Sequence, residues 1–389
     1  MNNNSNTALR WDALDVLRGL SIIGMLLNLN PGSWEHNYSW LVHARWEGWT
    51  LIDMVAPAFL FCVGAALPLS LQRRFAKGAS RKQLLAHVAT RSLILVALGV
   101  FLNLYPDFDF DHFRVPGVLQ RIGLCYGIVG AIVIATARVR VSGSLVIRPV
   151  LLASIAVFIL VSYWILLYAV PVLGSAAPRF DPVGSWPAVI DRAVIGTNHM
   201  FKFWPVNGQV TFDPEGIVST YPACFNVVLG VLVGWAYSSR KIQQPAAVAV
   251  ITGIGLIVLA ILARGVCPII KNLWTSSFAL LSGGISLTLL GVLMPISRQP
   301  VADSVLQPAR IFGENPLLAY VVSWLIGPLL DLPWIGSSEI PISLRNAGQL
   351  WFGQVLSPNA ASFLFGLCCL LLIFMLLVIC HRKRWILKI

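Results

Sequence analysis

Long apolar runs separated by short polar connectors dominate the hydrophobicity pattern of this chain. A helix needs about 20 mainly apolar residues to cross roughly 30 Å of hydrocarbon. Ten runs approach that length, and they predict an all-α, polytopic membrane helix bundle with about ten transmembrane helices. The predicted spans lie near residues 13–30, 51–72, 91–106, 117–137, 149–170, 218–238, 245–264, 274–296, 311–330 and 360–380.

The composition supports a membrane protein rather than a water-soluble one. The 389-residue chain is 57% hydrophobic and 11% charged, whereas soluble domains carry about 25% charged residues. The formal net charge of +12 would suggest nucleic acid in a soluble protein, but here the basic residues form short clusters between apolar runs. We therefore expect a single transmembrane domain over residues 1–389, a lipid bilayer around it and no nucleic-acid partner.

The basic clusters also predict the orientation of the chain. Most of the 28 lysines and arginines fall near the two ends of the chain and in alternate connectors. By the positive-inside rule this side faces the cytoplasm, together with both termini, because the number of spans is even. The basic connector 73–90 lies on this side, where contact with anionic headgroups is the favoured reading. Of the external connectors, residues 171–217 form the longest, which can fold as a lid over the bundle.

The connector after the first span concentrates polar and aromatic side chains. Asn30-Pro31-Gly32 should end the first helix, because proline lacks an N–H and glycine takes dihedrals that other residues avoid. His43 lies in this connector and Asp53 at the mouth of the next span. A group that exchanges a proton near pH 7 is what acyl transfer needs. The alternative is an interfacial loop with a belt of tryptophans, and both readings can hold together.

Further polar residues stand at the ends of spans, where a charge is costly and usually paired or functional. Arg121 opens the fourth span, and an Asp53–Arg121 pair would accommodate both charges; an interfacial, snorkelling arginine is the alternative. Asp213-Pro-Glu-Gly216 places two carboxylates before the sixth span, unless it is only a turn. Lys271-Asn-Leu-Trp274 opens the eighth span, where helix capping and a belt aromatic are the alternative.

The histidines and cysteines show no spacing typical of metal ligands, so we expect no metal. We interpret His36, His112 and His199 as loop histidines. The cysteines lie mostly inside apolar runs and are read as small buried side chains rather than a disulfide framework. They are Cys62, Cys125, Cys224, Cys267, Cys368, Cys369 and Cys380.

Taken together, these stretches resemble the membrane-bound heparan-alpha-glucosaminide N-acetyltransferase family and its bacterial relatives. The resemblance runs from Asp15-Val-Leu-Arg-Gly19 to the basic tail, with the motifs in the same order. Each motif is weak alone, but the set is specific. The markers are Asn30-Pro-Gly32, His43-Ala-Arg-Trp-Glu-Gly48, Asp53 with Pro57 and Phe59, Arg114-Val-Pro-Gly-Val-Leu-Gln-Arg121, Ile190-Asp-Arg192, Asp213-Pro-Glu-Gly216 and Lys271-Asn-Leu-Trp274.

The resemblance implies an enzyme that moves acetyl from cytosolic acetyl-CoA to the amino group of a terminal glucosamine on the far side of the membrane. It also implies a catalytic histidine in the loop after the first span, and His43 matches that position. For a bacterial relative it implies the inner membrane, an amino-sugar or glycan acceptor, and a homodimer as a possible assembly. The chain lacks the long N-terminal luminal region of the animal enzyme, so we expect an acceptor smaller than heparan sulfate.

Acetyl transfer to an amine needs a base, donors for the tetrahedral oxyanion and a positioned thioester. We expect His43 to act as general base or as a transiently acetylated nucleophile, Asp53 to orient it and Asn30 to donate to the oxyanion. The residues expected to bind the acceptor are Asp213, Glu215, Trp46, Trp49, Asn272 and Trp274. Those expected to bind acetyl-CoA are Arg114, Gln120, Arg121 and Lys271, although the external placement of the arginines is awkward for a donor that enters from the cytoplasm.

Two other functions fit the same residues. A transporter of a small anionic or sugar solute would use them as a site near the middle of the membrane and would move solute without consuming acetyl-CoA. An O-acyltransferase of cell-envelope carbohydrate would prefer hydroxyl acceptors to amines.

Overall fold

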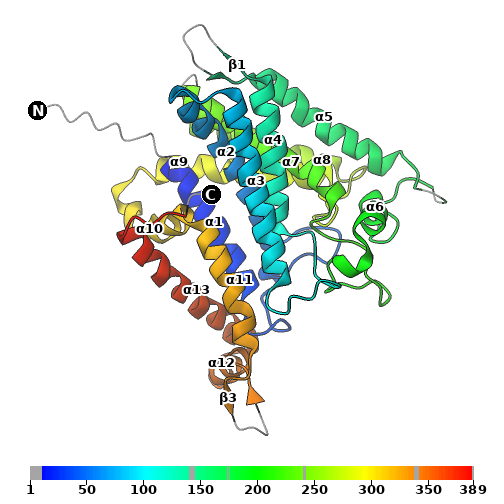
Figure 1. Ribbon diagram of the computed structural model, residues 1–389, viewed down its shortest axis with the longest axis vertical. Coiled ribbons are helices and arrows are strands. Elements are labelled where there is room, and N and C mark those ends of the chain that lie inside the picture. The colour runs from blue at the N-terminus through cyan, green and yellow to red at the C-terminus, as the bar shows by residue number, and fades with distance from the viewer. Residues whose placement is uncertain are drawn as a thin grey trace, which may run out of the picture.

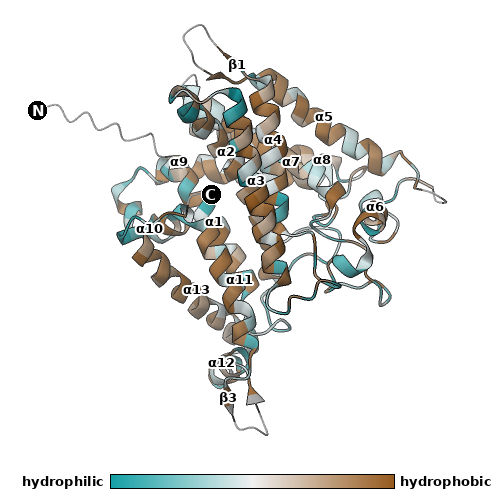
Figure 2. Ribbon diagram, viewed as in Figure 1, coloured by the Kyte–Doolittle hydropathy of each residue, from teal (hydrophilic) through white to brown (hydrophobic). Residues whose placement is uncertain are grey.

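The computed structural model describes residues 11–139, 145–172, 174, 176–239, 242–336 and 341–387. Within these ranges the chain forms thirteen α-helices and two small antiparallel hairpins, and Figure 1 shows the helices packed as one bundle. The prediction of an all-α membrane bundle is confirmed. The apolar segments of the helices and the polar connectors between them separate clearly in Figure 2.

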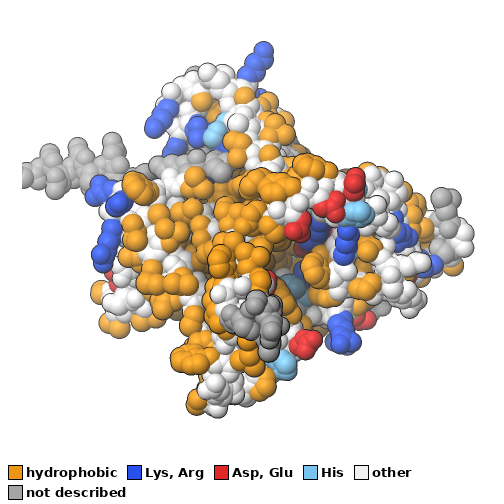
Figure 3. All heavy atoms as spheres, turned by 60° about the horizontal axis from the view of Figure 1, so that its bottom comes forward, with side chains coloured by type: hydrophobic (Ala, Val, Ile, Leu, Met, Phe, Trp, Pro, Cys, Tyr) orange, Lys and Arg blue, Asp and Glu red, His pale blue; other side chains and the backbone are white. Residues whose placement is uncertain are grey.

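Eight helices in the described part of the chain are long and apolar enough to cross a membrane. Hydrophobic side chains cover much of the face shown in Figure 3, as expected for helices that face lipid. The eight are α2 (Val55–Ala76, with the preceding 3-10 turn η2, Leu51–Met54), α3 (Arg81–Leu104), α4 (Val118–Thr136), α5 (Pro149–Tyr168), α7 (Ile217–Ser239), α8 (Pro245–Ala263), α9 (Ser276–Ile296) and α13 (Pro358–Arg382).

Two of the ten predicted spans take another form. Helix α1 (Asp12–Leu29) has 18 residues but carries acidic side chains in its first turn, and it falls outside the set of eight. The span predicted at 311–330 is divided, with α10 (Pro300–Glu314) ending where α11 (Pro316–Asp331) begins. Pro316 lacks the N–H that would continue the helical hydrogen bonds, so the chain bends at Asn315.

The connector predicted at 73–90 is also shorter than expected. Helix α2 continues to Ala76 and α3 begins at Arg81, so only residues 77–80 join them. Ser80 Oγ accepts a hydrogen bond from Gln83 N, and Gln83 Oε1 accepts one from Ser80 N. This capping box is a recognisable signal for a helix start, and it extends the predicted third span toward the N-terminus.

The helix pair α2 and α7 sets the geometry of the bundle. Gly230 allows close approach, because a Cβ there would lie 2.1 Å from the carbonyl oxygen of Phe61, and one at Gly234 would lie 2.2 Å from that of Ala65. Since Phe61 faces Gly230 and Ala65 faces Gly234, the two helices run parallel. Their N-terminal ends therefore lie at the same end of the bundle.

The connectors that precede α2 and α7 meet at this end, where the indole N–H of Trp46 donates to Phe180 O. Gly48 N donates to Ile269 O, which ties the connector before α2 to the one before α9. Val115 N donates to His199 O, which ties the connector before α4 to the long connector before α7. The latter carries α6 (Trp186–Ile195) and the turn η3 (Thr197–His199), seen beside the bundle in Figure 1; residues 173 and 175 of the predicted lid lie outside the described chain.

The remaining elements are short. They are η1 (Ser39–Leu41), β1 (Arg138–Val139) paired with β2 (Leu145–Val146), β3 (Ile335–Gly336) paired with β4 (Pro341–Ile342), and α12 (Leu344–Gly353). The seven cysteines are free, and all except Cys368 are buried. The interpretation of these cysteines as small buried side chains is confirmed for six of them.

Candidate functional site

His43 lies at the centre of the candidate site, in the connector between α1 and α2. Its Nδ1 lies 2.6 Å from Oδ1 of Asp53. The amino group of Lys271 lies 3.4 Å from the same His43 nitrogen and 3.8 Å from Asp53 Oδ1. The His43 side chain is 26% exposed, whereas that of Asp53 is fully buried. The structure thus brings together three residues that the sequence marks in separate motifs.

The turn that opens the second span fixes the carboxylate of Asp53. Its Oδ2 accepts hydrogen bonds from the backbone N–H of Thr50 at 2.9 Å, from the Thr50 hydroxyl at 3.1 Å and from Ala44 N at 3.2 Å. The other oxygen faces His43, so an ionised Asp53 selects the tautomer that carries hydrogen on Nδ1. The lone pair then lies on Nε2, and no hydrogen bond within the described chain occupies that nitrogen.

Electrostatics keep the imidazole of His43 neutral. Burial lowers the pKa of His43, and the positive charge of Lys271 lowers it further. The hydrogen bond to Asp53 and the charge of Asp53 act in the opposite direction but do not outweigh them. At pH 7 the ring is therefore a base that can accept a proton rather than an acid.

The predicted ion pair between Asp53 and Arg121 is not formed. Nη2 of Arg121 donates to Ser219 Oγ at 2.5 Å and to Gly216 O at 3.4 Å, and the guanidinium lies 4.8 Å from the ring centre of Trp274. Arg121 is 3% exposed. The start of α7 and an aromatic face therefore solvate this cation, while Lys271 supplies the cation beside Asp53.

A second cluster forms where the connector before α4 meets the one before α7. Nε of Arg114 donates to Asp213 Oδ2 at 2.9 Å, and Nη2 donates to Asp213 Oδ1 at 2.5 Å and to the carboxylate of Glu215. Asp213 also accepts from the backbone of Phe201 and of Glu215, both at 2.9 Å. Its side chain is fully buried, so Asp213 holds the connector together.

Glu215 links this second cluster to His43. Burial alone would raise the pKa of Glu215, but the positive charges of Arg114 and Lys271 lower it to about 2. Glu215 in turn acts electrostatically on His43. The carboxylate therefore remains ionised, 11% exposed, at the edge of the His43 cluster.

Helix α6 fixes the position of Glu215 through the start of α7. Asp191 is fully buried, and its Oδ1 accepts a hydrogen bond from Ile217 N, the first residue of α7. A carboxylate at a helix N-terminus satisfies a free N–H and interacts favourably with the helix dipole. Burial raises the pKa of Asp191 to about 6. The motif Ile190-Asp-Arg192 thus fixes the start of α7 and, with it, the turn that carries Glu215.

The tryptophans expected to bind a sugar differ in solvent exposure. Trp274 is 1% exposed, and its indole N–H donates to Asn226 Oδ1 at 3.1 Å. The indole N–H of Trp46 donates to Phe180 O at 2.8 Å, and its ring packs against Phe212. Of the three, Trp49 has the freest surface, with 45% exposure.

Three other predicted residues lie in the framework around the site. Asn272 is 1% exposed and donates to Arg45 O at 3.2 Å, which braces the loop of His43. Asn30 is 1% exposed and donates to Ser323 Oγ at 2.6 Å, against α11 rather than beside His43. Gln120 is 5% exposed and donates to Val115 O at 3.0 Å. None of these contacts places the side chain at His43 Nε2.

Two aromatic residues at the site are not among those predicted from the sequence. The ring of Phe201 lies 4.7 Å from the guanidinium of Arg114, and the ring of Trp204 lies edge-on to His43 with 6.1 Å between ring centres. Both precede a tight turn at Asn207-Gly208, where both residues have positive φ. Asn-Gly is a strong hairpin signal, and it marks this segment in the sequence.

A cavity of about 390 Å³ runs along α2 and is separate from the connectors. The α2 side chains that line it extend from Phe59, near the start of the helix, to Arg74 at its end. Most of the wall is apolar. The basic side chains of the wall are Arg18, Arg74, His87 and Arg91.

Two of these basic side chains have a polar atom without a hydrogen-bond partner. His87 Nε2 and Arg91 Nε are buried and have no hydrogen-bond partner within the described chain. A buried donor without a partner costs about 1–3 kcal/mol, so a ligand or water that fills the cavity would relieve this cost. Arg74 and His87, which fall in the predicted connector 73–90, line this cavity from the ends of α2 and α3.

The histidines outside the site have local partners. His36 contacts Ser33, His112 contacts Asp109, and Nδ1 of His199 contacts the carbonyl of Phe113. This agrees with their interpretation as loop histidines. Among the described residues, no group of three His, Cys, Asp or Glu side chains is placed to hold a metal ion.

Comparison with known proteins supports the resemblance to this family. The family described as "Domain of unknown function (DUF5009)" matches residues 10–109, which include His43 and Asp53. "Heparan-alpha-glucosaminide N-acetyltransferase" of Homo sapiens is 27% identical over 327 residues, 74% of this chain and 49% of the relative. The protein of the same name from Mus musculus is 28% identical over 371 residues, 85% of this chain and 55% of the relative.

The chain spans about half the length of the curated relatives it matches. The matched region nevertheless covers 74% of this chain for the human protein and 85% for the mouse protein. The resemblance predicted from the order of the motifs is confirmed: this helix bundle is similar over most of its length to the heparan-alpha-glucosaminide N-acetyltransferases of both species.

Proposed function

We propose that the protein transfers the acetyl group of acetyl-CoA to the amino group of a glucosamine-type sugar. The observation that carries this proposal is the His43–Asp53 pair, in which a buried carboxylate orients a neutral imidazole whose Nε2 is available. The names of the relatives support the choice of acetyl as the group and of an amino sugar as the acceptor.

His43 Nε2 can act in either of two ways. In direct transfer it accepts a proton from the attacking amine while the C–N bond forms and the thioester C–S bond breaks. In the two-step route it attacks the thioester first, and the acetyl-imidazole then reacts with the amine. In both routes the CoA thiolate leaves and receives a proton, and Asp53 stabilises the positively charged ring.

Lys271 serves the donor side of the reaction in this proposal. Its amino group lies 3.8 Å from Asp53 and is 7% exposed, so it neutralises that carboxylate in a low-dielectric setting. It is also the cation nearest to His43 in the cluster. An ammonium group here can stabilise the oxyanion that develops on the thioester carbonyl.

The donor enters through the cavity along α2. Arg18, Arg74 and Arg91 offer cations for the phosphates of CoA, and the apolar wall suits the pantetheine arm. The inner end at Phe59 is six residues from Asp53, or about 9 Å of helical rise. Arg74 lies in the last turn of α2, whereas the connector with His43 precedes its first turn, so this route approaches the site from the end of the bundle opposite the connectors.

In this proposal the cavity along α2 binds the donor, in place of Arg114 and Arg121, which were expected to do so from the sequence. Arg114 is paired with Asp213 and Glu215, and Arg121 is buried against Trp274. We assign Arg114 to the framework of the acceptor side. With the basic cavity mouth on the cytoplasmic side, acetyl-CoA and the acceptor reach His43 from opposite faces of the membrane.

On the acceptor side we assign Glu215 and Trp49. Glu215 is ionised, partly exposed and adjacent to the His43 cluster, so it suits the ammonium or a hydroxyl of an amino sugar. Trp49 offers an exposed face. Asp213 supports this surface through Arg114 and does not itself face solvent.

The test is an acetylation assay with purified protein in detergent, radiolabelled acetyl-CoA and a panel of amino sugars beside matched hydroxyl sugars. We expect amine-dependent transfer that is lost in His43→Ala, a drop of about 10²–10⁴ or more. Preference for hydroxyl acceptors would favour the O-acyltransferase. Solute uptake by proteoliposomes without acetyl-CoA consumption would favour the transporter, and either result would overturn the proposal.

A further inference from the structure

The segment from Phe201 to Asp213 forms a closed hairpin beside the site. Val206 N donates to Gln209 O at 2.9 Å, and Gln209 N donates to Val206 O at 3.0 Å. The base is closed by the hydrogen bond from Phe201 N to the carboxylate of Asp213. Because Asp213 is held by Arg114, the hairpin is attached to the acceptor side of the site.

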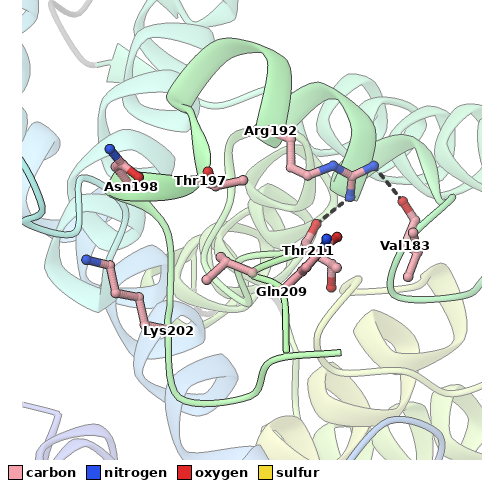
Figure 4. A pocket seen from close by; sticks show the side chains of 8 residues that line it. Val183, Arg192, Thr197, Asn198, Lys202, Gln209 and Thr211 are labelled. Carbon is pink, nitrogen blue, oxygen red and sulfur yellow. Dashed lines mark hydrogen bonds between the residues drawn. The ribbon is translucent and has the colours of Figure 1, made fainter. Parts of the chain in front are cut away.

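This hairpin forms one wall of a second cavity of about 500 Å³ (Figure 4). Its size falls within the range of small-molecule sites. Six of its eight lining residues are polar, so its chemistry suits hydroxyl groups better than an acyl chain. The lining residues are Val183, Arg192, Thr197, Asn198, Lys202, Gln209, Val210 and Thr211.

One lining group lacks a partner. The hydroxyl of Thr211 is buried without a hydrogen bond within the described chain, and the residue is 6% exposed. The backbone at this position is fixed, because Nη1 of Arg192 donates to Thr211 O at 2.6 Å and Nη2 donates to Val183 O at 2.7 Å, as Figure 4 shows. A buried hydroxyl without a partner loses the energy of its solvation, which a ligand hydroxyl would restore.

The charge of the cavity restricts what it can bind. Arg192 and Lys202 contribute two positive charges to the lining, and no lining residue is acidic. A second amino sugar with a free ammonium group would be repelled here. An N-acetylated or otherwise uncharged pyranose would meet amide, hydroxyl and cationic donors without this cost.

The hairpin connects this cavity with His43. Trp204 lies edge-on to the His43 ring, and its indole makes no hydrogen bond within the described chain. Lys202, which lines the cavity, is two residues away, and two residues of extended chain span at most about 7 Å. This separation is comparable to the length of one pyranose unit, so a disaccharide is long enough to reach both the cavity and Trp204.

We propose that the cavity at Thr211 and Gln209 is a second acceptor subsite, which binds the uncharged pyranose that follows the terminal amino sugar while Trp204 packs on the amino sugar itself. This inference rests on the proposed acetyl transfer at His43. It explains why the longest external connector folds back into a polar cavity instead of covering the bundle with apolar side chains.

The test compares three acceptors: glucosamine, the disaccharide glucosaminyl-N-acetylglucosamine, and the disaccharide of two glucosamines. We expect kcat/KM for glucosaminyl-N-acetylglucosamine to exceed that for glucosamine by about tenfold, the effect of one or two hydrogen bonds. The doubly cationic disaccharide should not share this advantage. Thr211→Val and Gln209→Ala should remove most of the advantage and leave kcat/KM for glucosamine unchanged.

The variants are chosen so that the fold survives. Valine has nearly the shape of threonine, and Gln209 is exposed. Gln299→Ala, an exposed amide at the start of α10, serves as the control and should behave as wild type. Equal kcat/KM for glucosamine and glucosaminyl-N-acetylglucosamine, or an equal loss on both in Thr211→Val, would overturn the subsite. Failure to acetylate any of the three acceptors would instead overturn the proposed function.

Discussion

Replacing Asp53 by asparagine tests the central pair directly. The Thr50 and Ala44 donors point at one carboxylate oxygen, and an amide oxygen can accept the same hydrogen bonds. The amide nitrogen then faces His43 Nδ1 and donates to it. Hydrogen must move to Nε2, so the ring presents a donor where the reaction needs a base.

The size of the effect follows from two losses. The hydrogen bond of 2.6 Å between His43 and the buried carboxylate is charge-assisted, and its loss costs about 1.5–3 kcal/mol. The wrong tautomer adds a further penalty, because the reactive form becomes a minor species. We expect kcat to fall by about 10³–10⁴, the order of the loss when the corresponding aspartate of a catalytic triad becomes asparagine.

Stability must be measured beside activity. In Asp53→Asn the buried Lys271 loses its closest carboxylate, so we expect the free energy of unfolding to drop by about 1–3 kcal/mol. The double variant Asp53→Asn with Lys271→Met removes both charges and should recover thermal stability without recovering activity. Acetyl transfer and thermal unfolding would be recorded on the same detergent-purified samples.

The outcome that refutes this reasoning is activity above about a tenth of wild type in a folded Asp53→Asn protein. The loss would then be smaller than the hydrogen bond alone predicts. His43 would be a loop histidine held by Asp53 for structural reasons, and the base would have to be sought elsewhere in the connectors.

Three further predictions concern the surrounding charges. In Lys271→Met the pKa of His43 should rise, because the cation that lowers it is removed, so the acid limb of the pH profile of kcat/KM moves to higher pH. In Arg91→Gln the KM for acetyl-CoA should rise about tenfold while the KM for the acceptor stays constant, and Arg148→Gln, an exposed arginine outside the cavity, is the control. In Glu215→Gln the KM for the acceptor should rise more than that for acetyl-CoA; an equal rise in both would indicate a role in folding.

Much of the fold is encoded locally and could be predicted. A span depends on the apolar length of one segment, so eight of the predicted spans correspond to long apolar helices. The break at Pro316 and the early start of α3 at Ser80 also have local signals, a proline and a capping box. The average hydropathy of a run conceals both signals, because it does not depend on the position of single residues.

The composition of the site was harder to predict, because its contacts join distant segments. His43 and Lys271 are 228 residues apart and Arg114 and Asp213 are 99 apart, so no spacing rule relates them. Asp53 could satisfy its charge with any cation that the packing brings near. The sequence suggested Arg121, but the structure places that residue against Trp274 and Ser219.

The basic residues show why function and topology are difficult to separate in such a chain. Arg74 and Arg91 fit the positive-inside rule, and that rule alone accounts for their presence. Both also line the cavity along α2, where the proposed donor would need cations for its phosphate groups. One arginine can serve both roles, because orienting the chain and binding an anion from the same compartment need a positive charge on the same side. The cytoplasmic arginines of a membrane transferase are therefore the first place to look for its donor site, even where orientation already explains them.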